Sequence, residues 1–165
     1  MRQIGQSMSS HRMLMDYSNN FYFPALKNYK KLVNDDYADA KSLAAYFIKL
    51  RESWDSIKIV KVEAGTKPVM QRGDPLNVTA YIDLSKMSPD DLSVELYHGT
   101  VSNQNRDITN ARRTEMKYTG AKDNLSLFHV RVECDDTGFQ GHTVRILPKH
   151  EALIHPYRTG LIKWA

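Results

Sequence analysis

The spacing of hydrophobic residues changes once along this chain of 165 residues, close to Trp54. Before Trp54, apolar residues recur every three or four positions, which is typical of amphipathic helices. After Trp54 they alternate with polar residues, which is typical of strands with one buried face. The pattern therefore predicts helices in the first third of the chain and a β-domain in the remainder.

The first predicted helix covers residues 7–22. Ser9 or Ser10 can cap its N-terminus. We expect Phe23-Pro24 to end or bend the helix, because proline disfavours helical conformation in the residue before it. The apolar face is broader than a single stripe, so the helix is expected to be buried on several sides. The residues of this face are Met8, Leu14, Met15, Tyr17, Phe21 and Tyr22.

A second amphipathic helix is predicted from about Asp36 to Trp54, with Asp35 or Asp36 as its N-cap. Its lysines and arginine lie mostly off the apolar face, which is typical of a helix that packs on one side. The apolar face consists of Ala40, Leu43, Ala44, Phe47, Leu50 and Trp54.

Residues 57–165 contain six or seven short alternating segments, separated by turn-forming glycine, proline and aspartate. With no helix between them, these segments predict a mainly β fold, in which the N-terminal helices precede an antiparallel β-sandwich. An immunoglobulin-like topology is the first choice, although the paired cysteines of that signature are missing. The expected strands are 57–62, 76–84, 92–98, 114–119, 127–133 and 142–148, with a last short strand in GLIKWA pinned by Trp164.

Charge and composition exclude several classes of protein. The net charge of +4 resides in residues 1–34, since the remaining residues hold equal numbers of basic and acidic side chains. Nucleic-acid modules concentrate positive charge on the folded recognition surface, so no nucleic-acid partner is expected. No apolar run approaches the roughly 20 residues that span a bilayer, and no signal peptide is recognised, so no membrane partner is expected. The single cysteine, Cys134, excludes an internal disulfide and suits a reducing cytoplasm.

Residue types that often carry chemistry form no recognisable catalytic or metal motif. The six histidines lack zinc-ligand spacing. His129 and His142 are expected on adjacent strands of the last hairpin, but two ligands predict no metal site. Asp90-Asp91 and Asp135-Asp136 are expected to cap turns. The segment GFQGH, residues 138–142, is expected to form a turn and a bulge, because a strand and not a helix follows it.

Two tyrosines lie at outward positions of predicted strands. Tyr81 and Tyr97 alternate with inward apolar residues and lie near Asp83 and Glu95. A tyrosine ring has an apolar face and a polar tip, so these residues could contact an α-glucan. Cross-strand pairing within the sheet, or contact with another domain, would explain the same pattern.

Several motifs resemble one enzyme family. The segment SMSSHRMLMDYSNNFYFPA is similar to a segment near the end of the catalytic region of α-glucan phosphorylases, the glycogen and maltodextrin phosphorylase family. The segments RESWDSIKI, MSPDDLSVELYHG, HTVRILPKHEAL and GLIKWA are similar, in the same order, to the C-terminal extension of the bacterial and archaeal branch. The first segment matches the family pattern at Ser9, Ser10, Arg12, Met13, Leu14, Asp16, Tyr17 and Tyr22.

The resemblance implies a parent enzyme that transfers a glucosyl unit between an α-1,4-glucan and phosphate, using pyridoxal phosphate. The family's cofactor lysine lies upstream of the arginine-tyrosine helix, and its substrate pockets lie between two large α/β domains. Nothing similar is present in these 165 residues. No catalytic, cofactor-binding or metal residue is therefore carried over. The chain alone is expected to be inactive, as an isolated fragment or the product of a split gene.

The resemblance also implies a division of the chain. Residues 1–34 would be the terminal helix of the catalytic region, residues 35–56 a connecting helix, and residues 57–165 the sandwich. The leading hypothesis is a cytoplasmic module for domain or subunit packing that contacts the missing catalytic domain and forms a homo-oligomer when isolated. The alternatives are a carbohydrate-binding sandwich that anchors the enzyme to glucan, and a stand-alone hydrolase that uses strand histidines. The expected packing residues are Arg12, Tyr17, Phe21 and Tyr22.

Overall fold

The computed structural model describes residues 9–65, 69–102 and 107–165. The chain forms two compact units, and the boundary between them lies after Tyr46, within helix α3 (Phe23–Ser53). Within the described part of the chain, every helix is too short or too polar to cross a lipid bilayer.

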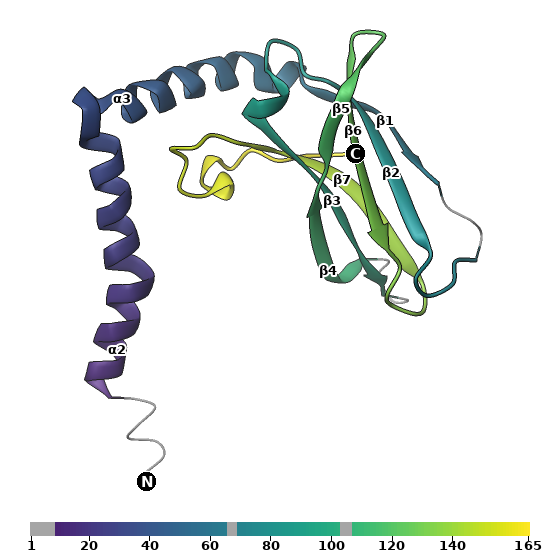
Figure 1. Cartoon of the computed structure of the whole chain (residues 1–165), viewed down its shortest axis with the longest axis horizontal. Helices are drawn as coiled ribbons and strands as arrows, with labels where there is room; N and C mark the ends of the chain where they lie inside the picture. The colour runs from purple at the N-terminus through teal and green to yellow at the C-terminus, as the bar shows by residue number, and fades with distance from the viewer. Residues whose placement is uncertain (1–8, 66–68, 103–106) are drawn as a thin grey trace. The chain divides into compact units, whose positions relative to one another are not determined.

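The first unit is helical (Figure 1). Helix α2 (Ser10–Tyr17) begins at Ser9, whose Oγ accepts a hydrogen bond from the Arg12 backbone N–H at 3.2 Å, so the predicted cap is confirmed. The helical path continues through Phe23-Pro24, where the sequence predicted an end or a bend. A π-helical turn, η1 (Ser18–Tyr22), precedes this dipeptide. Proline lacks an N–H and crowds the preceding turn, and a π-helical turn is a common way to accommodate such a disturbance.

A sharp break in α3 lies at residues 34–37. Asp35, Asp36 and Tyr37 adopt left-handed conformations with φ of 48°, 53° and 61°. Aspartate tolerates this conformation better than most residues, because its short polar side chain can bond to the nearby backbone. The second helical segment thus begins close to the predicted position. Asp36 is not in the extended conformation typical of an N-cap, and its carboxylate pairs with Lys41 Nζ at 2.7 Å.

The last turns of α3 belong to the second unit. Leu50 is fully buried, and Trp54, in the short 3₁₀ helix η2 (Trp54–Ser56), is also buried, as the helical pattern predicted. Phe47, which the pattern placed on the same face, is exposed. Lys49 Nζ lies 2.7 Å from Asp91 Oδ2 and connects this helix end to the sandwich.

The second unit confirms the predicted mainly β fold. Its eight described strands form two four-stranded antiparallel sheets, ordered β1-β2-β6-β5 and β4-β3-β7-β8 (Figure 1). The short 3₁₀ helices η3 (Pro89–Asp91) and η4 (Pro156–Thr159) lie in connections. The strands are β1 (Lys58–Ala64), β2 (Pro75–Asp83), β3 (Leu92–Val101), β4 (Ile108–Glu115), β5 (Lys117–Lys122), β6 (Leu125–Glu133), β7 (Gln140–Pro148) and β8 (Lys163–Trp164).

The core lies between the sheets and consists of the inward residues of the alternating strands. On β2 every second residue is buried, and the same alternation holds over the first half of β3. Burial of these side chains supplies most of the free energy of folding of such a sandwich. The fully buried residues on these strands and β7 include Val78, Ile82, Val94, Leu96, Val144 and Ile146.

The predicted strand at 114–119 is wrong, because two strands of different sheets meet there. Met116 separates β4 from β5 and is buried, and its N–H donates to the Val94 carbonyl at 2.8 Å. The chain leaves one sheet at this residue and enters the other. The sequence did not predict β4, because its segment ITNARRTE lacks alternating apolar residues.

Candidate functional sites

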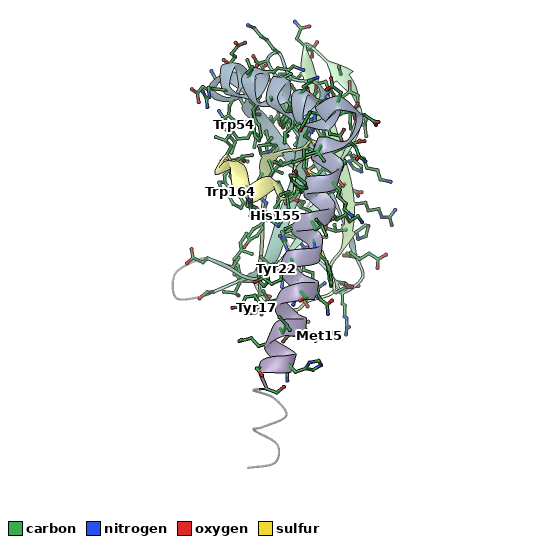
Figure 2. The ribbon with its side chains drawn as sticks, turned by 90° about the vertical axis from the view of Figure 1, so that its left-hand side faces the viewer. Met15, Tyr17, Tyr22, Trp54, His155 and Trp164 are labelled. Carbon is green, nitrogen blue, oxygen red and sulfur yellow. The ribbon has the colours of Figure 1, made fainter. Side chains whose placement is uncertain are left out.

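The predicted packing residues lie on an exposed aromatic surface of α2 and η1. Tyr17 is 49% exposed, Phe21 61% and Tyr22 63%. The ring of Tyr17 lies 5.6 Å from that of Phe21 and 6.5 Å from that of Tyr22, centroid to centroid. Figure 2 shows Tyr17 and Tyr22 on the same stretch of helix. Arg12 Nε lies 3.7 Å from Asp16 Oδ2, and both side chains are exposed.

This surface continues along the helical path. No residue of α2 is buried. Large exposed apolar patches are rare in monomeric proteins and mark interaction surfaces. We call the following exposed residues the helix face: Met13, Leu14, Met15, Tyr17, Phe21, Tyr22, Phe23, Leu26 and Tyr29.

Tyr81, a predicted glucan contact, lies on the outer face of the sheet that contains β2. Its hydroxyl donates to Glu63 Oε2 at 2.9 Å, and Lys61 Nζ lies 2.5 Å from Glu63 Oε1. The hydrogen bonds from Lys61 and Tyr81 lower the pKa of Glu63, and the bond to Glu63 raises the pKa of Tyr81. These three side chains form a cross-strand network that orients the tyrosine along the sheet.

Tyr97, the other predicted glucan contact, lies on the outer face of the second sheet. The structure therefore does not bring the two tyrosines together. Trp164 contacts Tyr97 edge to face, with ring centroids 5.4 Å apart and planes at 84°. Trp164 is 49% exposed, although β8 pairs with β7 at Arg145 as the predicted last strand requires.

A buried arginine holds this aromatic group together. The Arg145 guanidinium lies 5.4 Å from the ring centroids of Tyr97 and Trp164 and 5.3 Å from that of Tyr157. Its Nε and Nη2 donate to Glu95 Oε2 at 2.8 and 2.7 Å, and Nη2 also donates to the Tyr157 hydroxyl. Arg145 is only 6% exposed. We call these five residues the Arg145 cluster.

Sequence reasoning missed Arg145 and Tyr157. The alternation gave no signal, because a charge between the inward residues Val144 and Ile146 of β7 is also typical of a strand with a solvent-exposed outer face. Arg145 is nevertheless buried, and a buried charge is usually paired. The sequence does not indicate its partners, because Glu95 lies 50 residues away.

A pocket of about 530 Å³ lies at one end of the sandwich, between the two sheets. Leu76 and Val132 line it from the first sheet, and His98 and His142 line it from the second. The connection between β6 and β7 also contributes to its wall. Other residues of this wall are Cys134, Asp135, Asp136, Thr137, Gly138 and Phe139.

Three basic residues form a row across the second sheet at this pocket. Arg112 on β4 pairs with His98 on β3, and His98 pairs with His142 on β7. Arg112 lies 3.4 Å from Asp135 Oδ2 and 3.4 Å from Asp136 Oδ2. We call Arg112, His98 and His142 the polar row.

Both histidines of the polar row favour the neutral state. Burial, followed by Arg112 and His142, lowers the pKa of His98, and burial lowers the pKa of His142. His98 Nε2 lies 3.3 Å from Thr114 Oγ1. A neutral imidazole offers one donor and one acceptor, so each ring can bind a hydroxyl group.

The prediction that His129 and His142 lie on adjacent strands is wrong. Strands β6 and β7 belong to different sheets, and His129 Nδ1 instead lies 3.2 Å from Thr79 Oγ1 on β2. The inward orientation of His98 and His142 was predictable from the sequence, because both residues continue the alternation of the inward residues Leu96 and Val144.

The surroundings of the turn residue Asp91 and of Cys134 indicate structural roles and not catalytic ones. Asp91 forms a capping box with Ser88, as expected for a turn residue. Burial, then Asp74 and Asp135, raises the pKa of the Cys134 thiol, so this cysteine is a poor nucleophile. Among the described residues, no group of three or more histidine, cysteine, aspartate or glutamate side chains is placed to hold a metal ion.

The family model and the related proteins found by comparison indicate the same family. The family model described as "Glycogen phosphorylase C-terminal domain" matches residues 54–165, which include all eight strands. The chain is 28% identical to a glycogen phosphorylase of Mycobacterium bovis and 29% identical to a maltodextrin phosphorylase of Thermococcus litoralis. These alignments cover 100% and 99% of this chain but only 19% of either relative.

The alignments with relatives also extend over the helical first unit, which the family model does not cover. No solved structure matches the chain. Since the family model covers more than half of the sequence and the entire sandwich, the chain belongs to the glycogen phosphorylase C-terminal domain family.

Proposed function

We propose that this chain is the non-catalytic C-terminal region of an α-glucan phosphorylase, and that it acts as a domain- or subunit-packing module. The observation that carries this proposal is the helix face, where Tyr17, Phe21 and Tyr22 are half exposed or more. The chain spans about a fifth of the length of its relatives, so a larger partner surface is available in such enzymes. The single free cysteine supports the cytoplasm as its location.

Burial of the helix face would contribute substantially to domain packing. Fully burying one large apolar side chain is worth about 2 kcal/mol. Several such side chains on one helix could hold it against a neighbouring domain, even after the entropy of ordering them is subtracted. Arg12 and Asp16 lie on the same helix and could contribute hydrogen bonds at the edge of that contact.

The parent reaction that we propose is glucosyl transfer between an α-1,4-glucan and phosphate, with pyridoxal phosphate as cofactor. This cofactor requires a lysine for its Schiff base. The pocket at the end of the sandwich has no lysine among its lining residues and does not fit the cofactor. We therefore assign no residue of this pocket to the cofactor or to the reaction.

The packing role is tested in a phosphorylase that contains this region. A variant with Tyr17→Ser, Phe21→Ser and Tyr22→Ser should lower the melting temperature and detach the helix, as detected by limited proteolysis. The matched control is Val60→Ser with Ile154→Ser, since both residues are apolar and similarly exposed in the second unit. Equal melting temperatures for the two variants would contradict the packing role.

A second candidate function is carbohydrate binding that anchors the enzyme to glucan. The observation that favours it is the half-exposed indole of Trp164 beside Tyr97, close to polar groups of the Arg145 cluster. Aromatic faces next to hydrogen-bonding groups suit sugar rings. Maltoheptaose should change the tryptophan fluorescence, and Trp54 provides a buried reference, because the chain has two tryptophans. No saturable change would exclude this site.

We also infer an immunoglobulin-like topology for the sandwich. Its orders β1-β2-β6-β5 and β4-β3-β7-β8 correspond to strands A-B-E-D and C′-C-F-G of that arrangement. The observed pairings support this assignment without the disulfide that often accompanies it. An experimental structure with a different strand order would contradict it.

A further inference from the structure

The polar row occupies positions where a sandwich normally has core residues. Leu96 and Val144 are fully buried, and His98 and His142 continue the same inward alternation toward the pocket. Polar groups at inward positions are unfavourable unless they are hydrogen-bonded or face solvent or a ligand. Departures from the apolar pattern are expected at functional sites.

We propose that the pocket at this end of the sandwich binds a neutral, polyhydroxylated ligand, namely the end of a short oligosaccharide, through His98, His142 and Phe139. The site lies between the sheets, away from the outer face that carries Tyr97 and Trp164. The proposed site is therefore distinct from the surface of Tyr97 and Trp164, to which the second candidate function was assigned. Its volume of about 530 Å³ falls within the range of small-molecule sites.

The charges of the pocket favour a neutral ligand over an anion. The lining holds two positive side chains, Arg72 and Arg112, and three negative ones, Glu133, Asp135 and Asp136. Arg112, the charged member of the polar row, already faces the carboxylates of Asp135 and Asp136. An anion would have to compete with these two groups, which repel it. Hydroxyl groups can instead donate to the carboxylates and bond with the neutral imidazoles. The charge pattern thus suits a sugar better than inorganic phosphate.

The walls of the pocket also match the two kinds of surface on a sugar ring. The first sheet supplies the apolar side chains of Leu76 and Val132, which can contact the C–H face of a pyranose. The second sheet supplies the polar row, which can bond to hydroxyl groups. Sugar sites combine these features, because a pyranose has apolar faces and polar edges.

Phe139 provides an aromatic ring at this pocket. Its side chain is 77% exposed, yet its backbone carbonyl accepts a hydrogen bond from the Val101 N–H at 2.8 Å. The ring is therefore presented to solvent by an anchored backbone. A large exposed aromatic side chain beside a pocket is suited to stacking on a ligand.

The test is a titration of the full 165-residue chain with maltose and maltoheptaose, followed through the NMR signals of the histidine side chains. Signals of His98 and His142 should shift and saturate, whereas those of His129, on the other sheet, should not. Phe139→Ser should weaken binding about tenfold, and because this ring is exposed the variant should keep its fold. His142→Leu should weaken binding at least as much.

Two controls distinguish this pocket from the outer face and from an anion site. Ile154→Ser, at an exposed residue outside the lining of this pocket, should leave the affinity unchanged. No shift of His98 and His142 with either sugar, or a shift with inorganic phosphate alone, would overturn the proposal. Loss of binding in Trp164→Ala with full binding in Phe139→Ser would overturn it as well and assign the sugar to the outer face. The choice of α-glucan probes rests on the proposed function, but the packing role is tested separately, on the helix face.

Discussion

Arg145 shows how a single buried charge can fix the end of a chain on a sheet. Its guanidinium donates to Glu95 and to Tyr157, and it lies against the ring of Trp164 from the last strand. The planar guanidinium can form hydrogen bonds at its edge and stack on aromatic rings with its faces. The C-terminal residues are thus held by a side chain of β7 as well as by two-residue strand pairing.

Arg145→Met should destabilise the sandwich by about 3 kcal/mol, because it leaves Glu95 without its buried partner. Replacing both members, as Arg145→Met with Glu95→Leu, should recover much of this loss. Urea unfolding at neutral pH measures both effects. If the single variant unfolds with the wild-type midpoint, the cluster contributes nothing to stability.

The polar row predicts a pH dependence of stability. The pKa values of His98 and His142 are lower in the folded protein than the ordinary value near 6.5. The unfolded chain therefore binds more protons as the pH falls through that value, and the free energy of unfolding decreases. Arg112 adds to this effect at His98, and Asp136 partly opposes it.

Urea unfolding between pH 8 and pH 5 should thus show stability that is complete at the alkaline end and declines below about pH 6.5. The double variant His98→Gln with His142→Gln should flatten this decline. His129→Gln serves as the control outside the pocket. An identical slope in the wild type and the double variant would contradict this assignment.

At the scale of elements, the sequence predicted those strands whose alternation is complete. The segment LNVTAYIDL became β2 with nearly the predicted bounds, because each inward residue is apolar. Strand β4 lies at the edge of its sheet, and its polar sequence carries no such pattern. The sequence also did not predict the sharp break within α3, because residues 35–37 adopt left-handed conformations that local sequence rarely specifies.

The candidate sites were less predictable than the strands, because they depend on which strands become neighbours. Tyr97 was recognised from its outward position, but its contact with Arg145 required the pairing of β3 with β7. The pairing of His98 with His142 required the same information. Alternation shows which way a side chain faces, while strand order decides what it meets.

Gly99 is constrained by the close approach of the neighbouring strand β4. It lies at an irregularity where β3 pairs with β4, and a Cβ there would be 2.7 Å from the Thr109 carbonyl oxygen. Because this oxygen belongs to the backbone, the two strands would have to separate. We expect Gly99→Ala to destabilise the sandwich by about 2 kcal/mol.

The matched control is Gly65→Ala, since a Cβ there would have its nearest neighbour, the Asn77 carbonyl oxygen, at 3.7 Å. This variant should unfold within about 0.5 kcal/mol of the wild type. Thermal and urea unfolding of the two variants give the comparison. Equal losses of stability in Gly99→Ala and Gly65→Ala would mean that the close approach of β3 and β4 does not make a Cβ at residue 99 unfavourable.

At the scale of the whole molecule, the two units differ in how they satisfy their apolar residues. The second unit buries its inward residues between two sheets, whereas the helix face leaves many large side chains in solvent. This contrast is expected if the first unit completes its packing with another polypeptide surface. In the isolated chain, the surface of matching chemistry is a second copy of the helix face.

The isolated 165-residue chain is therefore predicted to self-associate at micromolar concentration through this helix face. Sedimentation velocity and light scattering should give a mass above 19.0 kDa that increases with concentration. Tyr17→Ser with Phe21→Ser should shift the equilibrium to the monomer, because both substitutions remove apolar area from the contact. Val60→Ser with Ile154→Ser, in the second unit, should leave the mass unchanged. A monomer across this concentration range would mean that the aromatic residues of α2 and η1 remain in solvent without a second copy, and the predicted homo-oligomer would be wrong.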